Sequence, residues 1–279
     1  MMTTPTLAPL TTADLAPLVP ELVLIGGAFA LLMLDLFVSQ RNKVWTHLFS
    51  VAVLAVVFAL LATGTGGQGE IFHGMFVRDT AADVMKTVIV LVSGLSLVYG
   101  WTYLRERNLY QGEIPVLVLF ATAGMMLLTS AGSLLMVYLG LELLALCSYA
   151  LVASNRDNGL ATEAAMKYFV LGSLASGLLL YGMSLVYGAT GTLSLSGIHD
   201  AIEGSNERTL LLTGTIFMIA GVAFKLGAAP FHMWLPDVYQ GAPARSPCSS
   251  ALRPSSLPSV WRIACSRSAW ARCRRSGIC

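Results

Sequence analysis

The stretch that decides the fold lies between residues 221 and 237, and it reads Gly221-Val-Ala-Phe-Lys225-Leu-Gly-Ala-Ala-Pro230-Phe-His-Met-Trp234-Leu-Pro236-Asp237. Lys225 comes late in an apolar run that begins near Thr209, and Pro230 follows about one helical turn later. Proline removes a backbone donor and clashes with the preceding turn, so it predicts the end of a helix or a bend in it. A charged residue at the centre of a membrane helix costs roughly 2.5–3.5 kcal/mol, which makes such a lysine a candidate functional group. We expect Lys225 to carry a proton.

The composition of the chain is that of a membrane protein. Of its 279 residues, 56% are hydrophobic and 11% are charged, whereas a soluble domain carries about a quarter charged residues. Seven apolar runs are long enough, or nearly so, to cross a bilayer, which takes about 20 residues as a helix. These runs are Leu18–Val38, Val44–Ala62, Ala82–Leu104, Ile114–Ser130, Leu134–Ala153, Glu163–Thr190 and Thr209–Ala229. The sequence therefore predicts an all-α, polytopic bundle of about seven transmembrane helices.

The basic residues of the loops predict how the bundle is oriented. Five of them fall in alternate loops, namely Arg41, Lys43, Arg105, Arg107 and Arg156. The remaining loops hold fewer basic residues and more acidic ones. Because cytoplasmic loops carry the excess of Lys and Arg, we expect the N-terminus outside and the segment after Lys225 in the cytoplasm. The glycine-rich loop 64–78 could form a small outer hairpin.

The character of the sequence changes at residue 244. Residues 1–243 hold all fifteen acidic residues and ten of the seventeen basic ones, whereas 244–279 hold seven Arg and four of the five cysteines. We expect 1–243 to be the membrane domain and 244–279 to have no structured fold. The tail could be a basic segment attracted to anionic lipid. The interpretation we favour is the product of a shifted reading frame, because a GC-rich gene read out of frame gives this composition.

Glu142 lies near the middle of the fifth run. Helical spacing places it on one semi-polar face with Tyr138, Ala145 and Tyr149, while leucines cover much of the rest. A carboxylate there could hold helices together through hydrogen bonds. We favour a role in proton transfer, because carboxylates at this depth are rare.

The two lysines differ in how far the sequence alone supports a function. Lys225 could be a lysine that reaches the interface from a helix end, although we favour a functional role because it sits in an apolar run. Lys167 follows Glu163 by four residues, a favourable ion-pair spacing on a helix surface, so spacing leaves function and surface pairing equally open.

Other polar or amphipathic positions are weaker candidates. Glu21 and Asp35 stand near the ends of the first run and are expected at the membrane interface, while Asp83 and Lys86 open the third run and are expected to pair locally. Trp234 fits an interface anchor. The body carries no phosphate-binding glycine loop and no cysteine cluster, so we expect no cofactor bound by this chain.

Three segments resemble a known family. They are Tyr138-Leu-Gly-Leu-Glu142-Leu, Ala165-Met-Lys167-Tyr-Phe, and the stretch from Phe224 through Pro230 and Asp237 to Gly241-Ala-Pro243. Together they are similar to the antiporter-like membrane subunits of respiratory NADH:quinone oxidoreductase, complex I. The resemblance covers about residues 15–243 and extends to subunits of multi-subunit Na⁺/H⁺ antiporters.

The resemblance implies a function and its site residues. It implies a proton-translocating, non-redox subunit in a bacterial inner membrane, in which Glu142, Lys167 and Lys225 form the input half of a proton channel. Quinone reduction in neighbouring membrane subunits would drive it, and NADH, FMN, the iron–sulfur clusters and the quinone would be held by partner subunits.

The sequence departs from the family pattern after Pro243. The family continues with further helices, whereas here Ala244-Arg245-Ser246-Pro247 follows, so we expect an antiporter-like fold that lacks its second half, truncated or frameshifted, with no independent activity. Two alternatives remain open: a subunit of a multi-subunit Na⁺/H⁺ antiporter, or an inert truncated fragment.

Overall fold

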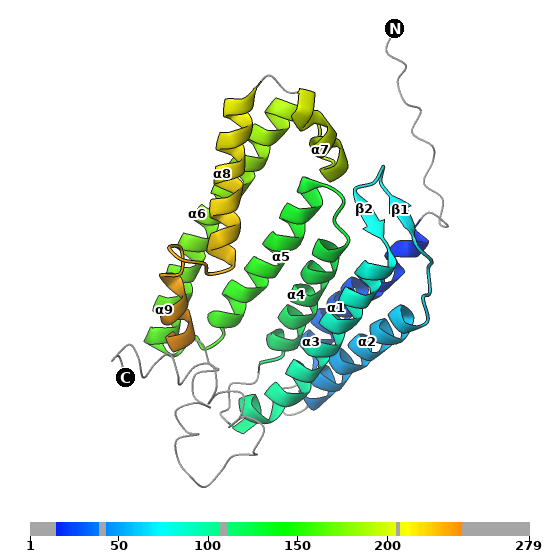
Figure 1. Ribbon diagram of the computed structural model, residues 1–279. Coiled ribbons are helices and arrows are strands. Elements are labelled where there is room, and N and C mark those ends of the chain that lie inside the picture. Colours follow the sequence, from blue (N-terminus) through cyan, green and yellow to red (C-terminus); the bar gives the residue numbers. More distant parts are fainter. Residues whose placement is uncertain (1–14, 39–42, 107–110, 205–206, 242–279) are drawn as a thin grey trace, which may run out of the picture.

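The computed structural model describes residues 15–38, 43–106, 111–204 and 207–241. The predicted tail 244–279 lies outside the described residues. Figure 1 shows a bundle of long helices, with a small hairpin and a short helix at one end. In chain order the elements are η1 (Ala16–Leu18), α1 (Val19–Phe37), α2 (Val44–Ala62), β1 (Gly69–Ile71), β2 (Phe76–Arg78), α3 (Thr80–Glu106), α4 (Glu113–Thr129), α5 (Leu134–Val152), α6 (Gly159–Thr190), α7 (Leu195–Gly204), α8 (Arg208–Lys225) and α9 (Trp234–Gly241).

The prediction of a polytopic helical membrane bundle is confirmed. Each of the seven apolar runs forms a helix, and six of these helices are long and apolar enough to cross a membrane. The helix of the fourth run, α4, is apolar but has 17 residues, which gives it a length of about 26 Å. Large apolar side chains such as Leu36, Leu95 and Leu174 point outward, as expected for a surface that faces lipid.

Helices α1–α4 enclose an apolar core at one side of the bundle. Leu24, Val57, Leu119 and Met126 come from α1, α2 and α4, and all four are fully buried. Val90 and Leu97 of α3 complete this core, so the first four helices form a unit with an interior of its own.

Two helix pairs cross at glycines. A Cβ added at Gly124 of α4 would meet the carbonyl oxygen of Gly140 of α5 at 2.9 Å, and the reverse substitution would do the same. Helices α6 and α8 meet in the same way, at Gly182 and Gly214. In membranes small residues let helix backbones approach closely, which replaces the hydrophobic driving force that water would supply. These four positions were not predicted from the sequence.

A small extended layer covers one end of the bundle. The predicted hairpin is confirmed, since β1 pairs antiparallel with β2, with Ile71 opposite Phe76. The turn between α4 and α5 continues this layer: Val77 N–H donates to the Ser130 carbonyl at 2.9 Å, and Leu134 N–H donates to the carbonyl of Leu193 at 2.9 Å. The helices thus share one cap built from three separate loops.

Helix α8 ends earlier than predicted, and for a different reason. The expected run reached Ala229 and was to be ended or bent by Pro230, whereas α8 ends at Lys225. Gly227 has φ of +63°, its N–H donates to Phe224, and the N–H of Ala228 donates to Ala223. These two bonds form a Schellman motif, which needs a glycine because other residues are strained at positive φ. Lys225 is therefore the last residue of its helix.

Candidate functional site

Glu142 and Lys225 lie on two different helices, α5 and α8, and are 83 residues apart in the sequence. Ser133 caps the start of α5, where its side chain accepts from the Met136 N–H at 3.3 Å, and Glu142 follows in the middle of this helix. The glycine-ended helix α8 places Lys225 at its last position, where a cation is favoured by the helix dipole. The side chains of Glu142 and Lys225 are 21% and 13% exposed, so both charges are largely removed from solvent.

The structure brings Glu142 and Lys225 into direct contact through an ion pair. Lys225 Nζ donates to Glu142 Oε1 at 3.0 Å and to Ser176 Oγ at 3.0 Å. The Ser176 hydroxyl in turn donates to the same Glu142 oxygen at 2.5 Å. Three helices, α5, α6 and α8, thus each contribute one member of a closed polar triad. Such groups need this mutual bonding, because an unpaired charge at this depth is costly.

The sequence predicts a packing role for Ser176 and did not reveal its polar role in the triad. It belongs to a set of small residues on α6 that looks like a packing surface, and Gly172 of that set does serve packing. Ser176 is 4% exposed and its hydroxyl is used entirely within the triad. Nothing in the local sequence separates it from Ser173, which bonds to the Val170 carbonyl of its own helix.

Lys167 lies apart from the triad. It forms the predicted i,i+4 ion pair with Glu163 at 2.9 Å, and a second ion pair with Asp237 of α9 at 3.0 Å. Its side chain is 47% exposed, and no contact described for it reaches Glu142 or Lys225. Asp237 was not predicted as a partner, because it comes to α6 only through the short helix that follows Pro230.

An aromatic cluster joins α5, α6 and α9. Tyr149 of α5 meets Tyr168 edge-on, with ring centroids 4.6 Å apart, and a Cβ at Gly172 would overlap the Tyr149 hydroxyl. Trp234 stacks on Tyr168 at 4.6 Å and its Nε1 donates to the Phe224 carbonyl at 3.1 Å. The prediction of Trp234 as an interface anchor is therefore wrong: it is buried and fixes α9 against α6.

The charged residues of the first and third helices also differ from expectation. Glu21 was expected at the interface but is fully buried, in an ion pair with Lys86. Asp83 and Lys86 were expected to pair with each other, yet Asp83 pairs with Arg78. Asp35 does lie near a helix end, 3.7 Å from Lys43. The sequence could not show these partners because they meet only when α1, the hairpin and α3 pack together.

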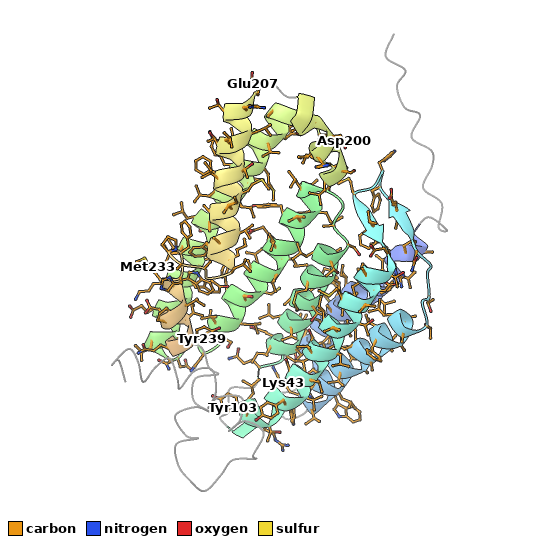
Figure 2. The ribbon with its side chains drawn as sticks, viewed as in Figure 1. Lys43, Tyr103, Asp200, Glu207, Met233 and Tyr239 are labelled. Carbon is orange, nitrogen blue, oxygen red and sulfur yellow. The ribbon has the colours of Figure 1, made fainter. Side chains whose placement is uncertain are left out.

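The two ends of the bundle carry different groups. In Figure 2, Lys43 and Tyr103 lie at the end of the bundle opposite Asp200 and Glu207. Within the described ranges, no group of three or more His, Cys, Asp or Glu side chains is arranged to hold a metal ion.

Comparison with known proteins gives the context of this site. Residues 131–252 match the family described as NADH:quinone oxidoreductase/Mrp antiporter, TM. The chain is 98% identical over 244 residues to NADH-quinone oxidoreductase subunit N of Xanthomonas euvesicatoria pv. vesicatoria (strain 85-10), which covers 88% of this chain and 50% of that protein. The resemblance to the antiporter-like membrane subunits of complex I is confirmed. Among these subunits the three resembling segments look more like subunit N than like its siblings L and M, and the 98% identity to a subunit N confirms this preference.

A more distant relative is also a subunit N. Subunit N of Halorhodospira halophila is 50% identical over 83% of this chain and 48% of its own length. The chain spans about half the length of the curated relatives it matches.

Solved structures share the fold. A chain of respiratory complex I from Thermus thermophilus with bound aureothin superimposes with a TM-score of 0.64 and 32% identity, covering 80% of this chain and 47% of that one. A chain of the Mrp complex from Dietzia sp. DQ12-45-1b gives a TM-score of 0.65 at 23% identity, over 84% of this chain and 44% of that one, which shows a common fold.

Proposed function

We propose that residues 1–243 form the proton-input part of an antiporter-like membrane subunit of NADH:quinone oxidoreductase. The observation that carries this proposal is the triad of Glu142, Ser176 and Lys225, drawn from three helices in the interior of a membrane bundle. Paired ionisable groups inside a membrane typically mark proton or ion pathways.

In this proposal Lys225 carries the proton and Glu142 controls it. A carboxylate close to an amine favours the protonated amine, and moving the two apart weakens that preference. A factor of ten in proton affinity corresponds to about 1.4 kcal/mol, so losing a few kcal/mol of attraction lowers the proton affinity of a lysine by orders of magnitude. A change in the Glu142–Lys225 distance, driven by neighbouring subunits, would therefore load or release one proton.

Lys167 serves as the next proton station toward the cytoplasm. It lies on the same helix as Ser176, nine residues earlier, which corresponds to about 14 Å along the axis. This distance is too long for a direct transfer, so water or hydroxyl groups must complete the path. The Tyr149 hydroxyl, which lies against Gly172, is placed between the two. Glu163 and Asp237 hold Lys167 when it is charged.

The same proposal specifies the membrane, the orientation of the chain and its partner subunits. The membrane is the bacterial inner membrane, with the N-terminus on the periplasmic side, as the loop charges indicate. Other membrane subunits of complex I are the partners, and NADH, FMN, the iron–sulfur clusters and the quinone belong to partner subunits. This chain contributes no redox chemistry of its own.

The test uses a full-length subunit N within the assembled complex, such as that of the 98% identical relative. Lys225→Met should abolish or strongly reduce NADH-driven proton pumping. Arg156→Met is the control, because it removes an exposed ion pair, that of Arg156 with Glu113. Unaltered pumping in Lys225→Met, with the complex assembled, would favour an inert role for this site.

Two further outcomes separate the alternatives. The matching family model also covers Mrp antiporters, so a sodium-coupled subunit is the second candidate. Uptake of radioactive sodium ions into proteoliposomes in exchange for protons, lost in Lys225→Met, would support that candidate. The 279-residue chain alone is expected to give no uncoupler-sensitive proton flux in liposomes, because it spans about half the length of the relatives it matches.

A further inference from the structure

A second buried polar cluster lies at the capped end of the bundle, outside the triad. It joins the first turn of α1, the end of β2 and the first two turns of α3 through Glu21, Arg78, Asp83 and Lys86. Glu21 and Lys86 are fully buried and Arg78 is 2% exposed. Charged side chains are almost never fully buried unless they are paired.

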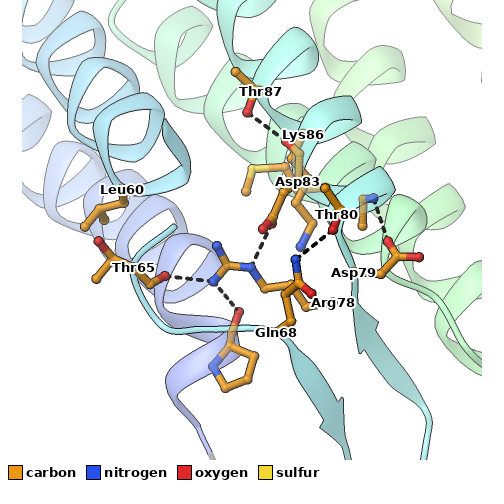
Figure 3. Close-up of polar contacts among 12 residues, drawn as sticks. Leu60, Thr65, Gln68, Arg78, Asp79, Thr80, Asp83, Lys86 and Thr87 are labelled. Carbon is orange, nitrogen blue, oxygen red and sulfur yellow. Dashed lines mark hydrogen bonds and ion pairs between the residues drawn. The ribbon is translucent and has the colours of Figure 1, made fainter. Parts of the chain in front are cut away.

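Arg78 ties the three elements together. Its Nε donates to Asp83 Oδ1 at 2.7 Å, and its Nη1 donates to the carbonyl oxygens of Pro17 at 3.3 Å and Thr65 at 2.9 Å. Figure 3 shows the guanidinium held between Asp83 and Thr65, with Lys86 on the turn of helix that follows Asp83. The buried Nη2 has no hydrogen-bond partner among the described residues.

Glu21 and Lys86 form the second half of the cluster. Lys86 Nζ lies 2.5 Å from Glu21 Oε1, and it also lies 4.9 Å from the centre of the Phe76 ring. Beyond this ion pair, the described residues offer no hydrogen bond to Glu21 Oε2 or Lys86 Nζ. Buried polar atoms in native proteins nearly always have a partner, so these atoms call for one.

The two halves face each other. Pro17, bound by Arg78, stands four residues before Glu21, and Asp83, also bound by Arg78, stands three residues before Lys86. Residues at these helical spacings are neighbours on one face. Arg78 and the Glu21–Lys86 pair therefore occupy the same polar space between α1 and α3.

The net charge of the cluster and its unpaired donor and acceptor atoms limit which kind of ligand can bind there. The two carboxylates balance the two cations, so no net charge attracts an ion. The atoms without partners include an acceptor, Glu21 Oε2, and donors, Lys86 Nζ and Arg78 Nη2. An anion would satisfy the donors and repel Glu21, while a metal cation would be repelled by Lys86 and Arg78. The ligand must be small and neutral, and it must both donate and accept.

We propose that ordered water binds at Glu21 Oε2, Lys86 Nζ and Arg78 Nη2, which makes this cluster a hydrated site inside the bundle. Buried waters typically form about three hydrogen bonds to polar groups that have no other partner.

X-ray radiolytic footprinting of the 279-residue chain in lipid nanodiscs tests the proposal. Radicals generated from bound water modify the side chains beside it, even when bulk solvent does not reach them. Phe76, against Lys86, should be modified strongly. Met126 is the matched control: it is equally buried at 0% exposure and intrinsically more reactive, but it lies in the apolar core. Modification of Phe76 no faster than that of Met126 would overturn the proposal.

Two variants separate bound water from opening of the hairpin. Replacing the pair with apolar residues, Glu21→Leu together with Lys86→Met, should reduce Phe76 modification several-fold, because the water loses its partners. Glu21→Gln keeps a polar group and should retain the modification. Unchanged labelling in the apolar double variant would mean that solvent reaches Phe76 by opening of the hairpin, and would also overturn the proposal. If the double variant does not fold, the comparison of Phe76 with Met126 in the unaltered chain decides.

Discussion

Ser176 and Lys225 are joined by a hydrogen bond of 3.0 Å in which the lysine donates to a serine that itself donates to Glu142. The hydroxyl therefore orients both partners of the ion pair. A bond to a charged group contributes about 1.5–3 kcal/mol, which is large enough to affect how the pair holds its proton.

Replacing Ser176 with alanine should lower proton pumping several-fold in the full-length complex and leave assembly intact. The reason is that Lys225 and Glu142 would each lose the hydrogen bond to Ser176 but keep the ion pair with each other. Pumping measured by quenching of a pH-sensitive dye in inverted vesicles checks this. Ser173→Ala is the control, since Ser173 bonds only within its own helix. Equal pumping in the two variants would contradict the role given to Ser176.

Removing one charge of the pair should destabilise the chain more than removing both. Lys225→Met or Glu142→Gln should each cost roughly 2–3 kcal/mol, somewhat less than a fully buried pair would, because the remaining charge loses its partner. The double variant Glu142→Gln with Lys225→Met should cost less than either single variant, and therefore less than their sum. Unfolding of the chain in detergent micelles measures these differences, and strict additivity would argue against a direct interaction.

Gly172→Ala should destabilise the chain by about 1–3 kcal/mol, because the added methyl group overlaps the Tyr149 hydroxyl in a closely packed contact. The control lies on the same helix: nothing stands within 4 Å of a Cβ at Gly177. Gly177→Ala should stabilise the chain by up to about 1 kcal/mol through helix propensity alone. Thermal unfolding of both variants in the same detergent gives the comparison, and the opposite order would show that α5 does not pack on α6 at Tyr149.

Gly227→Ala should cost about 1–2 kcal/mol, because alanine is strained at a φ of +63° and its Cβ would come within 2.5 Å of Leu235. Gly100→Ala serves as the control, since a Cβ there meets nothing within 4 Å. Gly227→Ala should also reduce pumping in the full-length complex, because the end of α8 positions Lys225. Unchanged stability in Gly227→Ala would show that the Schellman motif does not end this helix.

The seven helices α1–α6 and α8 could be predicted because each corresponds to a continuous apolar run, whereas the short helices α7 and α9 have no such run and were not predicted. Glu142 and Lys225 could be selected for the same reason, since charge stands out in such runs. Ser176 could not, because a serine in an apolar helix reads as a packing residue until its partners are known. The end of α8 was misplaced since Pro230 gives the stronger local signal, although Gly227 acts first along the chain.

The ion pairs of the first helices mark another limit of sequence reasoning. Glu21 reads as an interfacial residue because it stands in the first turn of an apolar run. Its partner Lys86 comes from a different helix, and the Arg78 beside it comes from the hairpin. Only the packing of α1 against α3 and β2 turns these separate charges into one cluster, and a single sequence without its fold does not show which helices are neighbours.

The glycine crossings have a mechanical consequence for the triad. Gly124 with Gly140 locks α4 to α5, and Gly182 with Gly214 locks α6 to α8. Glu142 belongs to the α4–α5 unit and Lys225 to the α6–α8 unit. A small slide of one unit along the other would stretch the two bonds that Lys225 and Ser176 make to Glu142 without bending any helix, so an applied force would be concentrated on this one carboxylate.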